Sequence, residues 1–331
     1  MPARPHFQKL VEQVRLLPPL VSAIVYPNDR DSLQLALSGA FAGYLAPVLV
    51  GPEARIRKVA DESGLDISRL QVIDTADRPR AAGIRAAELA REGSVSALIK
   101  GALSKEDLLA PVVAVKSGLR TETRLSHAYF LDIPGRERGF LLADAQLNVA
   151  PNLAAKRDIA RNTIALAHAL GIVEPRVALL AALDGAVSAF PSTTDAVELK
   201  AMAMKGAFPR AVIDGPLTPD SALSADAARA NDVASEVAGR ADALIAPTME
   251  AAIMVLRTLL AFNRGLAAGI VLGAKVPIVA PARRDAMETR MASCVLAALL
   301  VRAAAKDKTK ATNDANSLPD ATPLPNPFVA A

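Results

Sequence analysis

Two patterns of apolar residues alternate along most of the chain. Short runs rich in Val, Ile and Leu are typical of buried strands, and Ala-rich segments with apolar side chains on one face are typical of helices. Their alternation predicts βαβ units around a largely parallel sheet. In the first part of the chain the pattern predicts strands at 22–27, 47–51, 70–74 and 96–100. Helices are expected between them at 31–44, 52–63, 79–92 and 104–116.

The pattern changes in the segment 118–149. Residues 127–133 and 139–145 read as an antiparallel pair joined at Pro134-Gly135, a dipeptide that favours a turn. From Asn152 onward the alternation resumes, with helices at 156–170, 194–204, 249–262 and 287–304 and strands at 177–183, 211–214, 243–247, 268–272 and 277–281. We therefore predict an α/β fold of two lobes with doubly wound, largely parallel sheets and an active-site cleft between the lobes. Residues 306–331, rich in Pro, Asn and Asp without periodicity, are expected to form a disordered tail.

Composition narrows the class of protein. Of the 331 residues, 52% are apolar and 22% charged, which is typical of a globular protein with a substantial core. Charged residues or Pro interrupt every long apolar run, so no segment reaches the ~18 residues of a membrane span. The opening segment lacks the apolar core of a secretory signal. The single cysteine, Cys294, cannot form an internal disulfide, and a cytoplasmic location is expected.

The charge pattern argues against nucleic acid as a partner. The net charge of +4 is small for this length, and the basic residues are scattered among acidic ones. The chain has no Trp and only 3 Tyr, so aromatic platforms on which bases could stack are scarce. A small anionic ligand suits this balance better, because a few Arg side chains in a cleft are enough to bind it.

Several loops that follow predicted strands carry residues suited to binding a ligand. In α/β proteins ligands bind at the carboxyl ends of parallel strands, where Gly allows close approach to the backbone and Lys or Arg donates to phosphate. Taken singly, each such loop is more simply a turn or a solvated charge. The candidates are Lys100-Gly101, Asp144-Ala145 with Asn148, Asp214-Gly215-Pro216, Pro247-Thr248, Gly273-Ala274-Lys275 and Ala282-Arg283-Arg284-Asp285.

Familiar catalytic motifs are absent from the sequence. There is no HExxH, GxSxG, P-loop or GxGxxG segment. His127 and His168 have no acid or Cys at the spacing of zinc ligands, and Cys294 lies in the apolar stripe of the last predicted helix. The residues by themselves therefore predict a two-lobed α/β protein with a basic-lined cleft for a small phosphorylated ligand.

Eight segments of the chain form a recognisable series. They are LVGPEARIRKVADESGLD (49–66), ALIKGALSKEDLL (97–109), GLRTETRLSHAYFLDIPG (118–135), LLADAQLNVAPNLAAKRDIARNTIALAHALGI (141–172), FPSTTDA (190–196), KGAFPRAVIDGPLTPDSALS (205–224), ADALIAPTMEA (241–251) and AAGIVLGAKVPIV (267–279). In this order, and from about residue 32 to residue 300, they resemble the phosphate acetyltransferase and phosphate butyryltransferase family, and within it the short butyryl-type members.

The resemblance implies a fold and a reaction. The fold is expected to be similar to that of the isocitrate and isopropylmalate dehydrogenases, with residues 1–125 and 285–305 in the first lobe and an inserted second lobe at 126–284. The reaction is the reversible transfer of an acetyl or butyryl group between phosphate and the thiol of coenzyme A, without a metal. Acyl phosphate, phosphate and coenzyme A are then the expected partners, coenzyme A acts as a substrate, and a homodimer is expected.

The resemblance also implies roles for site residues. Arg283 matches the Arg of the family's Ser-Arg pair and is expected to bind phosphate, because a guanidinium binds a dianion bidentately. An acid shortly after that pair activates the thiol, and the sequence leaves Asp285 and Glu288 open for this role. Lys100, the Gly101 N–H or Arg283 are candidates to stabilise the oxyanion. Further substrate-binding candidates are Arg120 and Arg124 on the acyl-phosphate side and the loop residues Asp144, Asn148, Asp214, Gly215, Pro216 and Lys275.

Four positions depart from the family pattern. The family's Thr-Ser-Arg is Pro281-Ala282-Arg283 here, its Gly-Asn is Ala252-Ile253, a frequent His is Ser104, and its Val-Asn-Pro-Lys is Ala186-Val187-Ser188-Ala189. These losses keep open the alternative of a catalytically silent paralogue of the same fold that binds coenzyme A or phosphate. A metal-dependent decarboxylating dehydrogenase of similar fold is a weaker alternative, because the clustered Asp residues that would hold its divalent ion are missing.

Overall fold

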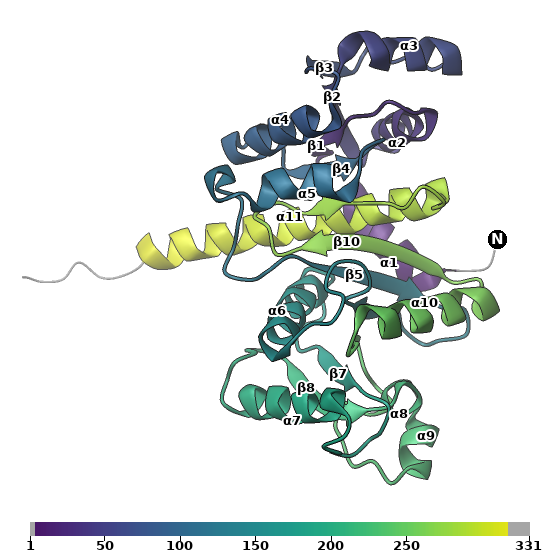
Figure 1. Cartoon of the computed structure of the whole chain (residues 1–331), viewed down its shortest axis with the longest axis vertical. Coiled ribbons are helices and arrows are strands. Elements are labelled where there is room, and N and C mark those ends of the chain that lie inside the picture. The colour runs from purple at the N-terminus through teal and green to yellow at the C-terminus, as the bar shows by residue number, and fades with distance from the viewer. Residues whose placement is uncertain (1–3, 317–331) are drawn as a thin grey trace, which may run out of the picture.

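The first part of the chain forms alternating strands and helices, as its sequence pattern predicts (Figure 1). The computed structural model describes residues 4–316, with side chains for residues 4–307 and 309. The strands are β1 (Leu20–Val25), β2 (Leu45–Gly51), β3 (Gln71–Asp74) and β4 (Ala97–Lys100). The helices are α1 (Pro5–Arg15), α2 (Arg30–Phe41), α3 (Glu53–Ser63), α4 (Pro79–Glu92) and α5 (Lys105–Val113), followed by the 3-10 turn η1 (Val115–Ser117). Helix α1 is additional to the prediction.

The second part contains the predicted antiparallel pair and a further series of strands and helices. The strands are β5 (Ser126–Asp132), β6 (Phe140–Ala143), β7 (Arg176–Leu180), β8 (Val212–Leu217), β9 (Ala243–Ile245), β10 (Leu266–Leu272) and β11 (Ile278–Val279). The helices are α6 (Leu153–Ala169), α7 (Pro191–Met204), α8 (Pro219–Leu223), α9 (Ala225–Ala230), α10 (Met249–Asn263) and α11 (Met287–Asn316).

One mixed sheet joins both parts of the chain. Within the described residues it has 11 strands in the order β3-β2-β1-β4-β11-β10-β5-β6-β9-β7-β8. Three antiparallel pairings, β11–β10, β10–β5 and β5–β6, lie next to one another in the middle, and the other pairings are parallel. The α/β class is confirmed, although the two predicted lobes share one sheet. Because the number of reversals is odd, β6, β9, β7 and β8 run opposite to β1 and β4.

Local signals in the sequence place two of the loops that matter below. The side chain of Asp29 accepts a hydrogen bond from the Ser32 N–H at 2.7 Å and begins α2 just after β1. Ser104 Oγ accepts from the Asp107 N–H at 2.9 Å and begins α5 just after β4. These caps satisfy N–H groups that the first turn of a helix leaves without partners, and so they define where each loop ends.

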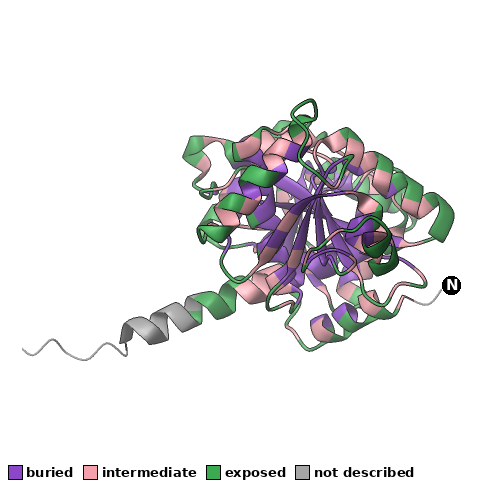
Figure 2. Cartoon of the chain, turned by 90° about the horizontal axis from the view of Figure 1, so that it is seen from below, coloured by how far each residue is buried: buried purple, intermediate pink, exposed green. Residues whose placement is uncertain are grey.

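The buried residues are concentrated in the strands and on the inner faces of the helices (Figure 2). Every residue of β5, β6, β9, β10 and β11 is buried, which explains their nearly continuous apolar sequence. On one face of the sheet, α11 packs against α1, α2 and α6. None of the described helices combines the length and the apolarity that a membrane span needs.

One sequence-based expectation fails in part. Helix α11 continues to Asn316, so the segment expected to be disordered from residue 306 is helical in its first part. Its residues up to that point are mostly Lys, Ala, Asp and Thr without Pro, a composition that a helix tolerates. The remainder of the predicted tail, 317–331, lies outside the described residues. β11 belongs by sequence to the predicted inserted lobe but pairs with β4, and the division at residues 126 and 284 stays a prediction.

Candidate functional site

The carboxyl ends of β1, β4 and β11 lie side by side, and the loops that follow them enclose a cavity of about 280 Å³. The three strands are parallel, so their following loops meet at the same edge of the sheet. The lining residues are Asp29, Arg30 and Asp31 after β1, Lys100, Gly101 and Ala102 after β4, and Pro281, Arg283 and Arg290 after β11. We call this cavity the strand-end pocket.

The strand-end pocket is suited to an anion. Four of its lining residues are cationic and two are acidic, so positive charge is in excess. Burial lowers the pKa of Lys100, the cations Arg283 and Arg290 lower it further, and Asp29 acts in the opposite direction. Mutual repulsion of this kind arises where cations converge on one space, and a bound anion relieves it. The structure therefore brings together the predicted residues Lys100, Gly101 and Arg283.

The N–H of Gly101 is bonded within the protein backbone and does not point to an oxyanion role. Its N–H donates to the carbonyl of Val25 at 2.9 Å and is therefore not free to bind a ligand, contrary to the sequence-based suggestion. A Cβ at this position would lie 2.6 Å from the carbonyl oxygens of Val25 and Tyr26. Glycine is needed here because two chain segments approach each other closely. Lys100 and Arg283 remain as the predicted oxyanion donors.

The structure separates the two candidate acids. Asp285 lies in the same loop as Arg283, and its carboxylate accepts a hydrogen bond from the Ala282 N–H at 2.7 Å. Glu288 lies in the first turn of α11, where its carboxylate contacts Arg4 from the segment before α1, and it does not line the strand-end pocket. Neither acid lines the strand-end pocket, but Asp285 lies in the loop that carries Arg283, whereas Glu288 lies on α11 and contacts Arg4.

Asp144 and Asn148 hold together the loop that follows β6, and neither lines the strand-end pocket. The buried Asp144 accepts hydrogen bonds from the N–H groups of Gln146 and Leu147 and from the Asn148 side chain, at 2.6–3.0 Å. Asn148 also donates to the carbonyl of Leu125 at 3.0 Å. Burial lowers the pKa of Lys105, and the nearby charges of Asp144 and Asp285 act in the opposite direction. Lys105 at the start of α5 is thus close enough to feel the charges of both this loop and the Arg283 loop.

Three predicted substrate-binding cations lie elsewhere. Lys275 follows β10, which runs opposite to β4, so it lies at the other edge of the sheet, where its N–H donates to the carbonyl of Leu119. Arg120 forms an isolated bridge with Ala274 at the same edge. Arg124 pairs with Asp158 of α6 at 3.7 Å. None of the three lines the strand-end pocket.

The Asp214-Gly215-Pro216 segment is part of a strand and not a turn. β8 runs through it at the outer edge of the sheet, where Pro is tolerated because an edge strand leaves N–H groups unpaired. Asp214 pairs with Lys200 at 2.6 Å. Burial alone would raise the pKa of Asp214, but hydrogen bonds from Lys200, Ser235 and the Gly215 N–H outweigh it and lower the pKa. Five strands lie between β8 and β11, so this segment does not join the strand-end pocket.

The remaining titratable candidates are structural. Burial, aided by Lys105, lowers the pKa of His127 to about 3, so the ring is neutral at physiological pH. Burial raises the pKa of the Cys294 thiol to about 12, which agrees with its prediction as a small core residue. His168 contacts the carbonyl of Arg210 at 3.1 Å. Across residues 4–316 no three His, Cys, Asp or Glu side chains are grouped as metal ligands.

The positions that depart from the family pattern leave the strand-end pocket open. Ser104, in place of a frequent His, caps α5, and the Ala282 N–H is bonded to Asp285. Ile253 lies on α10 and does not line the pocket. The loss of the Ser hydroxyl at Ala282 therefore removes one polar group without blocking the space.

Sequence reasoning missed Asp29, Asp31 and Arg290. Asp29 and Asp31 follow β1 as Lys100 follows β4, and the same rule about strand-end loops would have found them. Arg290 lies just before the uncharged helical run Met291–Leu300, and its burial is seen only in the structure. A buried cation needs partners, and these become visible only in the fold.

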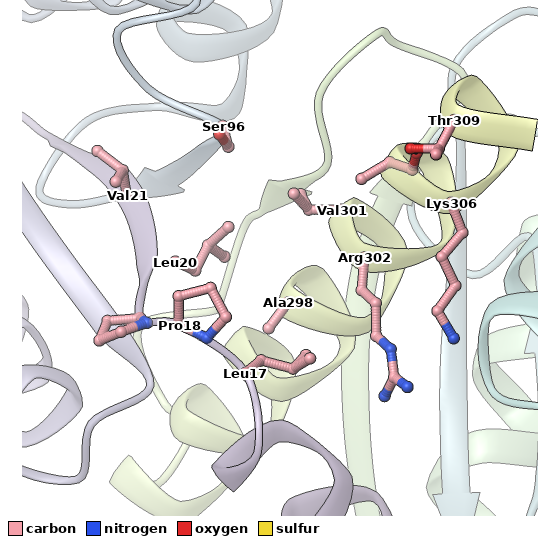
Figure 3. Close-up of a pocket in the computed structure, with 12 residues that line it drawn as sticks. Leu17, Pro18, Leu20, Val21, Ser96, Ala298, Val301, Arg302, Lys306 and Thr309 are labelled. Atoms are coloured by element: carbon pink, nitrogen blue, oxygen red, sulfur yellow. The ribbon is translucent and has the colours of Figure 1, made fainter. Parts of the chain in front are cut away.

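A second, larger cavity of about 840 Å³ lies at the opposite edge of the sheet (Figure 3). It is lined by Leu17, Pro18 and Leu20 at the start of β1 and by Ala298 and Val301 of α11. Its charged lining residues, Arg302 and Lys306, both come from α11. This mostly apolar surface offers no convergence of cations from different loops, and we do not assign the anion site to it.

Comparison with known proteins gives consistent matches. A family model described as "Phosphate acetyl/butaryl transferase" matches residues 80–298. A phosphate acetyltransferase of Rhizobium meliloti is 42% identical over 299 residues, which cover 90% of this chain and 94% of that protein. A phosphate butyryltransferase of Clostridium beijerinckii is 32% identical over 295 residues, which cover 89% and 97%. The crystal structure of a branched-chain phosphotransacylase from Enterococcus faecalis V583 has a TM-score of 0.75 at 26% identity and covers 85% of this chain and 99% of that one.

Proposed function

Because the chain belongs to the phosphate acetyl/butyryltransferase family, we propose that it transfers an acyl group reversibly between phosphate and the thiol of coenzyme A. The observation that carries this proposal is the strand-end pocket, in which Lys100 and Arg283 converge from different loops. A cavity of about 280 Å³ holds a phosphoryl group and a short acyl chain but not coenzyme A, whose thiol must approach from the open side.

The reaction requires three things of these residues. Arg283 has no ion-pair partner among the described residues and is free to bind the phosphoryl oxygens. Asp285 takes the thiol proton, because a thiol is mostly protonated at neutral pH. The sulfur attacks the acyl carbon, the bond between that carbon and the phosphate oxygen breaks, and phosphate leaves. Lys100 stabilises the oxyanion formed between these two steps.

The chain's relatives act on acetyl and butyryl groups by name, and we propose short acyl phosphates as its substrates. The experiment is a coupled assay in which purified protein, coenzyme A and acetyl, propionyl or butyryl phosphate are mixed and released phosphate is monitored. We expect turnover well above background with at least one of the three. No turnover with any of them, together with coenzyme A binding in a thermal-shift titration, would favour the catalytically silent binding protein instead.

The choice of base gives a separate prediction. Asp285→Asn is expected to lower kcat by about 10- to 100-fold, because it removes the proton acceptor while keeping an oxygen for the Ala282 N–H. Glu288→Gln is expected to change kcat by less than about threefold, since Glu288 contacts Arg4 outside the pocket. Steady-state rates at saturating substrates measure both. A larger loss for Glu288→Gln than for Asp285→Asn would reverse the assignment.

Two further expectations come from the sequence. A cytoplasmic location follows from the single cysteine and the use of coenzyme A, and a homodimer follows from the family resemblance. We propose that the protein acts in the cytoplasm as a homodimer.

A further inference from the structure

We propose that Arg290 is a second guanidinium of the strand-end pocket, which holds the Arg283 loop with two of its nitrogens and offers the third to the bound phosphoryl group. This inference rests on the proposed function and names a residue beyond it. Arg290 lies in the first turns of α11, seven positions after Arg283, and lines the same cavity.

Arg290 holds the loop through backbone carbonyls. Its Nε donates to the carbonyl of Asp285 at 3.0 Å, and its Nη2 donates to the carbonyl of Arg283 at 3.1 Å. Nη2 also lies 3.5 Å from the carbonyl of Ala282. One side chain thus contacts the backbone carbonyls of three residues in the loop that carries Arg283 and Asp285. Bonds to backbone fix where the loop runs, whichever side chains it carries.

The charge of Arg290 is only partly compensated. Its side chain is buried, with 6% of the residue exposed, and among the residues that the structure describes it has one ion-pair partner, Asp31 of α2, at 3.3 Å from Nη2. Asp31 is itself mostly exposed, so water screens this pair. A buried cation with a weak counter-charge favours a second anion, and the space beside it is the strand-end pocket.

The third nitrogen is available for that anion. Among the described residues, Nη1 of Arg290 has no hydrogen-bond acceptor, although Nε and Nη2 are both used. Nη1 is also not among the fully enclosed polar atoms without a partner, and Arg290 lines the pocket. The positive field of Arg290 reaches Lys100, whose ammonium lines the same cavity. Lys100, Arg283 and Arg290 would then surround one phosphoryl group from three directions.

The test exploits the difference between Arg and Lys. Lysine keeps the charge, but its three N–H donors diverge from one nitrogen and cannot reproduce the spacing at which three guanidinium nitrogens reach two loop carbonyls and an anion. We expect Arg290→Lys to weaken the binding of inorganic phosphate by about tenfold or more, measured by isothermal titration calorimetry, because charge-assisted hydrogen bonds are lost. Coenzyme A binding, measured in the same way, is expected to change by less than about threefold.

The matched control is Arg136→Lys. Arg136 is also a partly buried arginine that donates to a backbone carbonyl, that of Leu223 at 3.0 Å, but it lies on the hairpin between β5 and β6, away from the pocket. We expect this variant to bind phosphate as the parent protein does. Equal phosphate affinity for Arg290→Lys and the parent would overturn the proposal, and so would equal losses for Arg290→Lys and Arg136→Lys.

A crystal structure of the unaltered protein with inorganic phosphate tests the contact even if Arg290→Lys does not fold. The proposal expects Nη1 within about 3.2 Å of a phosphate oxygen. Phosphate bound with Nη1 turned away, or no phosphate in the pocket at saturating concentration, would overturn it. Both tests measure binding, so they remain decisive if the acyl-transfer assay fails and only the proposed function is wrong.

Discussion

Replacing Arg283 with alanine is expected to lower kcat/KM for the acyl phosphate by about 10²- to 10³-fold, whereas the KM for coenzyme A should change by less than about threefold. The reason is that Arg283 lines the strand-end pocket without an ion-pair partner among the described residues, so its guanidinium is free to bind the phosphoryl group. In the reverse direction we expect the same variant to raise the KM for phosphate. Initial rates with each substrate varied in turn measure these effects.

Arg284→Ala is the matched control for Arg283→Ala. Arg284 is the next residue in the same loop and is also exposed, but it does not line the pocket. Its replacement removes the same charge from the loop, so any general loss of positive field appears in both variants. Equal or negligible effects on the phosphate-side constants in the two variants would show that Arg283 does not bind phosphate.

We expect phosphate binding to weaken as the pH rises, and at a lower pH than for a site that uses a lysine of ordinary pKa. Burial and the neighbouring cations Arg283 and Arg290 lower the pKa of Lys100 from its usual 10.5. The charged ammonium is the form that attracts the anion, so its charge and the affinity are lost together as the pH rises through this lowered pKa. Titration calorimetry with inorganic phosphate from about pH 7 to about pH 10 follows the loss without interference from a thiol.

Two variants identify Lys100 as the group responsible. Lys100→Arg keeps its charge throughout this range and is expected to abolish the alkaline decline. Lys100→Met is expected to reduce phosphate affinity by about 10²-fold at neutral pH and to show no decline above it. If the decline persists unchanged in Lys100→Arg, another group causes it and Lys100 is not part of the anion site.

Most of the fold could be predicted because it depends on local patterns. The runs SAIVYP and SALIK are mostly apolar, and the strand found at each overlaps the predicted range. The Pro134-Gly135 dipeptide correctly marked an antiparallel pair, since turn residues act over a few positions. The prediction failed at Gly215-Pro216, where an edge position in the sheet allowed a strand to continue through a turn-like sequence.

Less of the site could be predicted. The rule that strand-end loops meet at one edge assumes that all the strands run the same way. It succeeded for Lys100 and Arg283, because β4 and β11 are parallel neighbours. It failed for Lys275, because β10 runs against them and delivers its loop to the opposite edge. Arg120 and Arg124, carried over from the family resemblance, also lie outside the pocket, each with a partner elsewhere.

The sequence by itself determined that this is an α/β protein of a known transferase family and that Arg283 and Lys100 are available as cations, because apolar periodicity and ordered motifs are properties of the chain. Only the tertiary structure decided which cations share a pocket, that Asp285 and not Glu288 lies in its loop, and that Arg290 holds that loop. Strand direction and strand order are set by pairings between residues far apart in sequence, and a reversal in the middle of the sheet moves a loop from one edge to the other.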